Sequence, residues 1–88
     1  MYLPGVCALQ ADALFASALR GDELNAWRIR QAIIVSLDAY GAGGCAGRVA
    51  QEFGDHPETA AVRMRWARAA VAFLGSQPAP QIRRTAAA

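Results

Sequence analysis

The stretch from Gly44 to Leu74, GCAGRVAQEFGDHPETAAVRMRWARAAVAFL, decides our prediction of the fold. It predicts a short helix, a tight turn and a longer helix. We expect the short helix to end at Gly54, because glycine readily takes the left-handed conformation that ends many helices. Pro57 suits the first turn of the next helix, where its missing N–H loses no partner. Glu58 then places a negative charge where the helix dipole favours one.

The N-terminal half of the chain predicts two further helices. Residues 6–20 contain no helix breaker and are followed by Gly21, with Asp22 as the expected N-cap of the next helix. Residues 23–40 carry apolar side chains at helical spacing. These are Ile29, Ile33, Leu37 and Tyr40, with Trp27 and Ile34 on an adjoining side. The glycine-rich residues 41–44 are expected to form a flexible joint between the second and third helices.

The chain of 88 residues has the size of one small domain. We predict an all-α domain over residues 1–75, with four helices and a C-terminal helix-turn-helix at 45–74. Residues 76–88 contain two prolines and no apolar periodicity, so we expect a disordered tail there. The hydrophobic fraction of 55% is rich in alanine, which buries little area per residue. Oligomerisation is a common way to stabilise such a small domain.

The composition predicts neither a membrane-spanning segment nor a metal site. No stretch approaches the ~18 to 20 apolar residues of a membrane span, and no secretion signal is recognisable, so we expect a cytoplasmic protein. Cys7 and Cys45 match no metal-binding spacing. The single histidine, His56, lacks convergent ligands, and its place before Pro57 predicts a turn or helix-cap residue. We therefore predict no metal and no cofactor.

One glycine motif and three nucleophilic side chains are the candidates for enzymatic chemistry. Residues 41–46, GAGGCA, match the dinucleotide-binding pattern GxGxxA. That chemistry needs a buried strand before the motif and a second parallel strand after it, whereas the chain here predicts only helices. Ser17, Ser36 and Cys45 have no assignable base. We therefore predict a non-enzymatic protein without a small-molecule substrate.

Residues 56–71, HPETAAVRMRWARAAV, resemble the second helix of the DNA-binding region four of extracytoplasmic-function sigma factors. The positions that match that family's pattern are Pro57, Glu58, Thr59, Arg63, Met64, Ala67 and Arg68. The preceding RVAQEFG at 48–54 resembles the family's first helix, so the resemblance covers residues 45–71. It implies that helix 57–74 is a recognition helix in the major groove. The nucleic-acid-binding residues expected on it are Thr59, Arg63, Arg65 and Arg68.

The predicted second helix of this pair departs from the family in being apolar on two sides. A step of about 100° per residue places Ala60, Met64, Ala67, Val71 and Leu74 on one face. Val62, Trp66, Ala69 and Phe73 fall on nearly the opposite face. A helix that is apolar on two sides must bury both. Either the first helix covers the second face, or a partner chain does.

Two functions therefore remain open. The first is a small, dimeric DNA-binding protein that regulates transcription, with double-stranded DNA as its partner and Arg63, Arg65 and Arg68 near phosphates. The net charge of +2 permits such a partner without requiring it. The second is a non-catalytic helical module for dimerisation or for binding another protein, which uses Val62, Trp66 and Phe73 as its interface.

Overall fold

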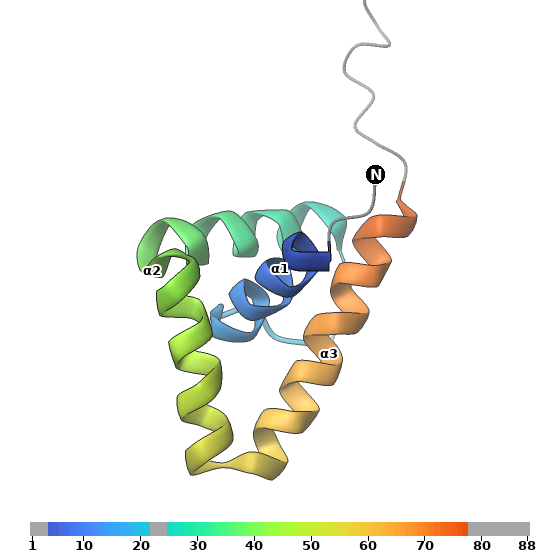
Figure 1. Cartoon of the computed structure of the whole chain (residues 1–88). Coiled ribbons are helices and arrows are strands. Elements are labelled where there is room, and N and C mark those ends of the chain that lie inside the picture. The colour runs from blue at the N-terminus through green and yellow to red at the C-terminus, as the bar shows by residue number, and fades with distance from the viewer. Residues whose placement is uncertain (1–3, 22–24, 78–88) are drawn as a thin grey trace, which may run out of the picture.

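The computed structural model describes residues 4–21 and 25–77, and all regular structure in these ranges is α-helical (Figure 1). The helices are α1 (Pro4–Ala16), α2 (Ala26–Asp55) and α3 (Pro57–Ser76). The all-α prediction is confirmed for these residues, but they form three helices instead of four. The predicted cap at Asp22 and most of the predicted tail, residues 78–88, lie outside the described residues. None of the described helices is long and apolar enough to cross a membrane.

Helix α1 begins and ends earlier than the predicted range 6–20. Pro4 occupies its first turn, where proline costs no hydrogen bond. The helix ends at Ala16 because Ser17 forms a tight turn with Leu14. Both the N–H and the hydroxyl of Ser17 donate to the Leu14 carbonyl, at 3.1 and 2.6 Å. Serine side chains compete with helical hydrogen bonds in this way, which the absence of glycine or proline did not reveal.

Helix α2 contains a sharp break at Gly41. The helix begins at Ala26, and the side chain of Asn25 caps it by accepting the Arg28 N–H at 3.0 Å. Gly41 has φ 72° and ψ 171°, a conformation that is essentially restricted to glycine. The predicted joint at 41–44 is therefore a one-residue kink. It divides α2 into a first segment (26–40) and a second segment (42–55), which run in different directions (Figure 1).

The connection between α2 and α3 is the single residue His56. Its N–H donates to the Glu52 carbonyl at 2.7 Å, and its carbonyl accepts the Ala60 N–H at 2.9 Å. The prediction that His56 is a turn or cap residue is confirmed, as is Pro57 in the first turn of α3. The predicted helix end at Gly54 is wrong, because Gly54 is helical and has no positive φ. The connection is shorter than the turns of about three or four residues in DNA-binding helix-turn-helix units.

The core lies where α1 packs between the first segment of α2, the second segment and α3 (Figure 1). The largest side chains that are fully buried are Leu14, Ile29 and Cys45. Much of the remaining core consists of alanine, which lets the helix axes approach closely. The predicted inward face of α3 is confirmed: Ala60, Met64 and Ala67 are buried, and Val71 and Leu74 are partly buried.

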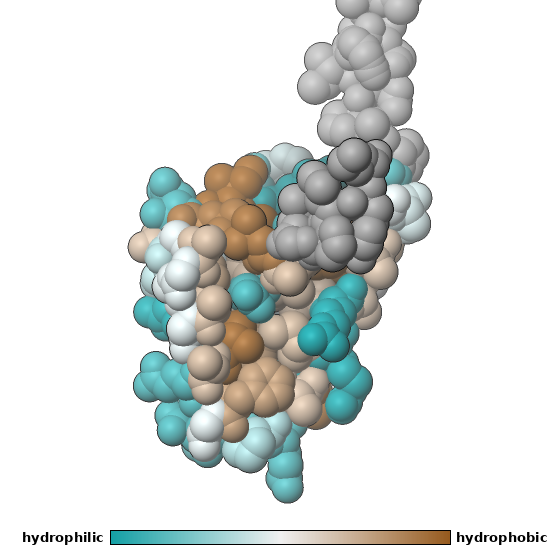
Figure 2. Space-filling model, viewed as in Figure 1, coloured by the Kyte–Doolittle hydropathy of each residue, from teal (hydrophilic) through white to brown (hydrophobic). Residues whose placement is uncertain are grey.

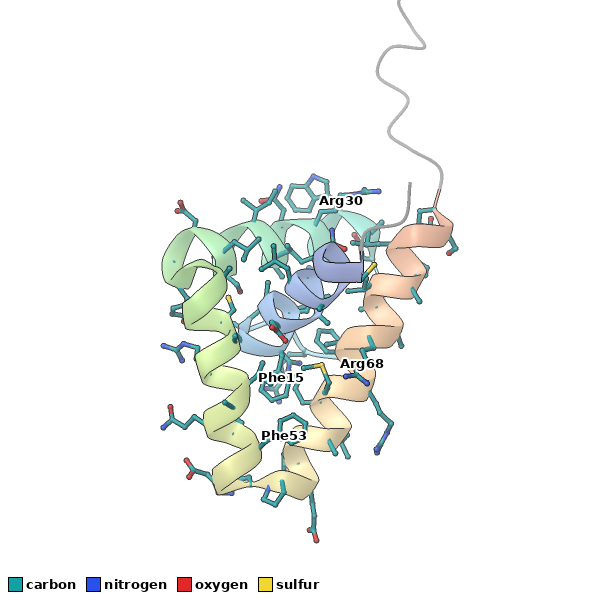
Figure 3. All side chains as sticks on the ribbon, in the orientation of Figure 1. Phe15, Arg30, Phe53 and Arg68 are labelled. Atoms are coloured by element: carbon teal, nitrogen blue, oxygen red, sulfur yellow. The ribbon has the colours of Figure 1, made fainter. Side chains whose placement is uncertain are left out.

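The two phenylalanines Phe15 and Phe53 stack between the second segment of α2 and α3 (Figure 3). Their ring centroids lie 6.1 Å apart, with an angle of 20° between the ring planes. Phe15 is 7% exposed and Phe53 is 38% exposed. This stacked contact joins α1 to the end of α2, three residues before the turn at His56.

Candidate functional site

Arg63 reaches from α3 to the C-terminal end of α1. Its Nε donates to the Phe15 carbonyl at 3.2 Å, and its Nη1 donates to the Leu19 carbonyl at 2.8 Å. Its Nη2 donates to the carbonyls of Leu14 and Ser17 at 3.0 and 2.9 Å. The last carbonyls of a helix have no partner within the helix and carry the negative end of its dipole. Arg63 therefore caps α1 from another helix.

These contacts occupy most of the guanidinium of Arg63. An arginine has five N–H donors, and four carbonyl oxygens accept from this one. Burial lowers the pKa of Arg63, and the positive charge of Arg20 lowers it further. Arginine nevertheless stays protonated in proteins, so the carbonyls face a charged group. In this conformation Arg63 faces α1 and not an external phosphate.

The chain that follows α1 covers Trp66. The guanidinium carbon of Arg63 lies 4.2 Å from the centre of the Trp66 ring. A Cβ built on Gly21 would lie only 2.8 Å from Trp66 Cδ1, so the Gly21 backbone packs directly on the indole. Trp66 is half-buried as a result, and Phe73 is also half-buried against the core. Val62 is 57% exposed, so the predicted interface residues Val62, Trp66 and Phe73 do not form one continuous exposed surface.

The expected nucleic-acid-binding residues lie on different parts of the surface. Thr59 and Arg63 line a polar hollow of about 440 Å³ between the second segment of α2 and α3, together with Arg48 and Glu52. Arg68 lines a separate hollow between α1 and α3. Arg65 is exposed and lines neither. The structure thus places Thr59 beside Arg63 and separates both from Arg68.

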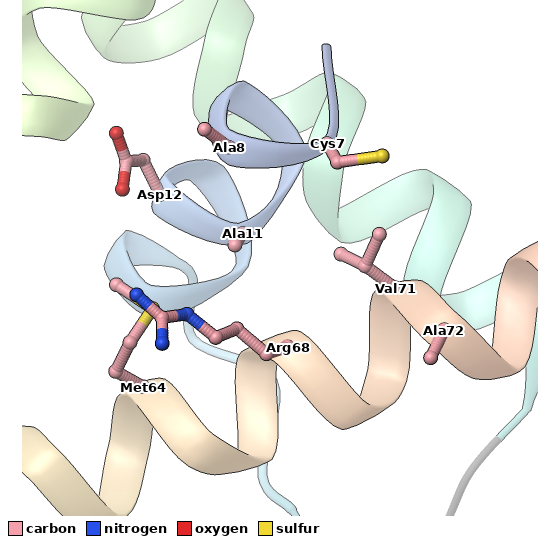
Figure 4. A pocket seen from close by; sticks show the side chains of 8 residues that line it. All are labelled: Cys7, Ala8, Ala11, Asp12, Met64, Arg68, Val71 and Ala72. Atoms are coloured by element: carbon pink, nitrogen blue, oxygen red, sulfur yellow. The ribbon is translucent and has the colours of Figure 1, made fainter. Parts of the chain in front are cut away.

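The hollow beside Arg68 has a volume of about 390 Å³ and is mostly apolar (Figure 4). Alanine side chains of α1 and α3 form much of it, and Met64 and Arg68 line it from α3 (Figure 4). Cys7 and Asp12 contribute the polar atoms from α1. No group of three or more potential metal ligands converges in the described ranges 4–21 and 25–77.

The nucleophilic side chains Ser17, Ser36 and Cys45 are buried or hydrogen-bonded within the fold. Ser17 donates to the end of α1, and Ser36 is 2% exposed. Cys45 is fully buried, with its Sγ 3.6 Å from the Ser36 carbonyl oxygen. Burial raises the pKa of the Cys45 thiol, and the negative charge of Asp12 raises it further. A protonated, buried thiol is a poor nucleophile.

The large apolar side chains with the greatest exposed fractions lie on the first segment of α2. Trp27, Ile34 and Val35 are 66%, 58% and 61% exposed. Trp27 and Ile34 are seven residues apart, which is about two helical turns, so they share a side of the helix. Ile29 lies on nearly the opposite side from Trp27, and Ile33 lies about 100° around the helix from Ile34; both are buried. Figure 2 shows apolar side chains gathered over this part of the molecule.

We call this surface the α2 outer face. It comprises Trp27, Arg30, Ile34, Val35 and Asp38. Arg30 lies at its edge, beside the hollow that Ile34 also lines, and Asp38 is exposed (Figure 3). The sequence contained a signal for this surface: three consecutive large apolar residues at 33–35 cannot all face one core from one helix.

Comparison of the chain with protein-family models, with curated proteins and with solved structures gives no match in any of the three. The resemblance of residues 45–71 to sigma-factor region four therefore stays a prediction from those residues.

Proposed function

We propose that this protein is a non-catalytic helical interaction module that binds a protein partner through the α2 outer face. The observation that carries the proposal is the exposure of Trp27, Ile34 and Val35, each more than half exposed on one helical segment. Grouped apolar side chains of this kind mark interaction sites in small soluble domains. Tryptophan is also enriched among the residues that contribute most binding energy.

The fold itself does not account for these side chains. Ile29 and Ile33 already bury the inner side of the same segment. A polar residue at position 27 or 34 would leave that core contact unchanged. Full burial of one large aliphatic side chain contributes about 1.5 to 3 kcal/mol. Within residues 4–21 and 25–77, the exposed part of Ile34 does not gain this contribution, so association could supply it.

A second proposal is DNA binding through the exposed side of α3. Arg65 and Arg68 favour it, because both are exposed and neither forms an ion pair within the described part of the chain. Arg63 is not among the DNA contacts proposed here, because its guanidinium donates to carbonyls at the end of α1. A loss of DNA binding in Arg63→Ala would report damage to the fold as well as a lost contact. Arg65→Ala is the better variant.

The two proposals are separated by one set of variants. We would compare the native chain with Ile34→Glu, and use Val62→Glu on α3 as the matched control, because both positions are similarly exposed. Complex size would be measured by sedimentation for the purified chain and by native fractionation for the tagged chain in an extract of its source cells. We expect Ile34→Glu to lose a complex that Val62→Glu retains. Identical complexes for all three chains would contradict the interaction proposal.

DNA binding would be measured on the same proteins with duplex DNA at two salt concentrations. A complex that weakens with salt and is further weakened by Arg65→Ala, while Ile34→Glu has no effect, would favour the DNA proposal. If neither the native chain nor any variant binds duplex DNA, the DNA-binding proposal is wrong.

A further inference from the structure

We infer that the partner of the α2 outer face is a second copy of this chain, packed antiparallel across a two-fold axis at Ile34. The inference rests on the proposed function and names its partner. A two-fold interface uses the same surface on both copies, so that surface must be complementary to itself. Three features of the first segment of α2 meet this requirement.

The first feature is the placement of opposite charges around Ile34. Arg30 precedes Ile34 by four residues, and Asp38 follows it by four, so all three lie on one side of the helix. In an antiparallel pair centred on Ile34, Arg30 of each copy faces the partner's Asp38. Within one chain the two charges are separated by about 12 Å along the helix axis, and neither forms an ion pair in the described residues.

The second feature is the fit of Trp27 to the kink. Trp27 precedes the axis by seven residues and Gly41 follows it by seven, so each Trp27 faces the partner's Gly41. A Cβ built on Gly41 would meet no atom within 4 Å, which means that the space in front of it is open. The exposed indole of Trp27 would lie against this side-chain-free backbone. Both ends of the interface are then closed by the same contact.

The third feature is the apolar centre. Ile34 meets the partner's Ile34 on the axis, and Val35 lies beside it on each copy. The order of side chains along the interface is therefore apolar at the centre, charged on either side and aromatic at the ends. Paired charges outside an apolar centre fix the register of an antiparallel helix pair. Burial of this surface also supplements a core that is rich in alanine.

Charge reversal tests this register directly. Arg30→Asp alone places an aspartate against the partner's Asp38 at both ends of a homodimer. Asp38→Arg alone places two arginines together in the same way. We expect each single variant to raise the dimer dissociation constant about tenfold or more, because two attractive pairs become repulsive. The double variant, Arg30→Asp with Asp38→Arg, should return to within about threefold of the native value.

A mixture of the two single variants gives a sharper result. One chain then carries acidic residues at 30 and 38, and the other carries arginines at both positions. We expect them to form a one-to-one heterodimer in preference to either homodimer, as measured by native mass spectrometry and sedimentation equilibrium. Circular dichroism would establish that each variant remains helical. Arg65→Asp, on exposed α3, is the control for a change of net charge alone.

The outcomes separate this inference from the proposed function. Single variants that dimerise like the native chain, or a double variant that is not restored, overturn the antiparallel register. If Ile34→Glu still disrupts the native dimer in that case, the proposed function stands. If the native chain stays monomeric up to millimolar concentration, the inference that the partner is a second copy is wrong. If the chain then still forms a larger complex in the extract, and Ile34→Glu abolishes it, the proposed interaction with another protein stands.

Discussion

The guanidinium carbon of Arg63 lies 4.2 Å from the centre of the Trp66 ring, and the same guanidinium donates to four carbonyls at the end of α1. One arginine thus connects a helix end to an aromatic ring on α3. The Gly21 backbone also packs on this ring, so Trp66 contacts both Arg63 and the residues that follow α1. Side chains that the sequence offered as binding groups here hold the fold together.

Arg63→Ala should lower the free energy of unfolding by about 2 to 4 kcal/mol. Hydrogen bonds to a charged group contribute more than neutral ones, and the substitution removes a donor from four part-buried carbonyls, of which Leu14 keeps the donors of Ser17. Arg63→Lys should recover only part of the loss, since an ammonium cannot span four acceptors as a planar guanidinium does. Urea unfolding followed by circular dichroism measures both. Exposed Arg65→Ala, the control, should change stability by less than about 0.5 kcal/mol.

Gly21→Ala should destabilise the fold by about 1 to 3 kcal/mol, because the added Cβ would lie 2.8 Å from Trp66 Cδ1. The fluorescence of Trp66 should change along with the unfolding midpoint. Gly47→Ala is the matched control: a Cβ there meets nothing within 4 Å, and alanine is favoured over glycine within a helix. Its expected effect is a gain of about 0.5 to 1 kcal/mol. Equal effects at the two positions would show that Gly21 does not contact the indole.

Gly41→Ala should also destabilise the fold, for a reason that involves no clash. A Cβ at Gly41 has open space around it, but φ 72° with ψ 171° is strained for any residue with a side chain. The expected cost is about 1 to 3 kcal/mol. Gly43→Ala, two residues further along in regular helix, should be neutral or stabilising. A Gly41→Ala chain as stable as the native one would mean that the kink is not present in solution.

Much of the helical content followed from local patterns in the sequence. Proline at 57 began α3, and the apolar spacing from Ala60 to Ala67 identified its buried side. The single-residue kink did not follow, because a run of glycines at 41, 43 and 44 does not indicate which of them leaves the helix. The prediction that a helix ends at Gly54 was wrong because a glycine near a helix end can remain helical. Here the helix continues to Asp55, and His56 provides the turn.

The roles of the α3 side chains were harder to predict, because they depend on contacts distant in sequence. Arg63 is 44 residues from the Leu19 carbonyl it contacts, and no local pattern relates the two. The second apolar side of α3 was recognised, but its cover at Trp66 is the Gly21 backbone, which has no side chain to signal the contact. The helical spacing predicts Trp27 and Ile34 on a side next to the buried one. Their exposure depends on how the other helices pack, and within the described residues they are more than half exposed.

The raised pKa of the buried Cys45 thiol predicts how the free energy of unfolding depends on pH. That pKa is raised above its ordinary value of 9.0 by burial and by Asp12, so the folded chain holds its proton more tightly than the unfolded chain does. Its contribution to stability is therefore fully present below pH 9 and is lost as pH rises from 9 through the folded-state pKa. Unfolding free energy, measured in urea from pH 8 to 10.5, should fall more steeply for the native chain than for Cys45→Ala. Cys7→Ala, which removes an exposed thiol, should retain the native slope. A native slope in Cys45→Ala would assign the pH dependence to other groups.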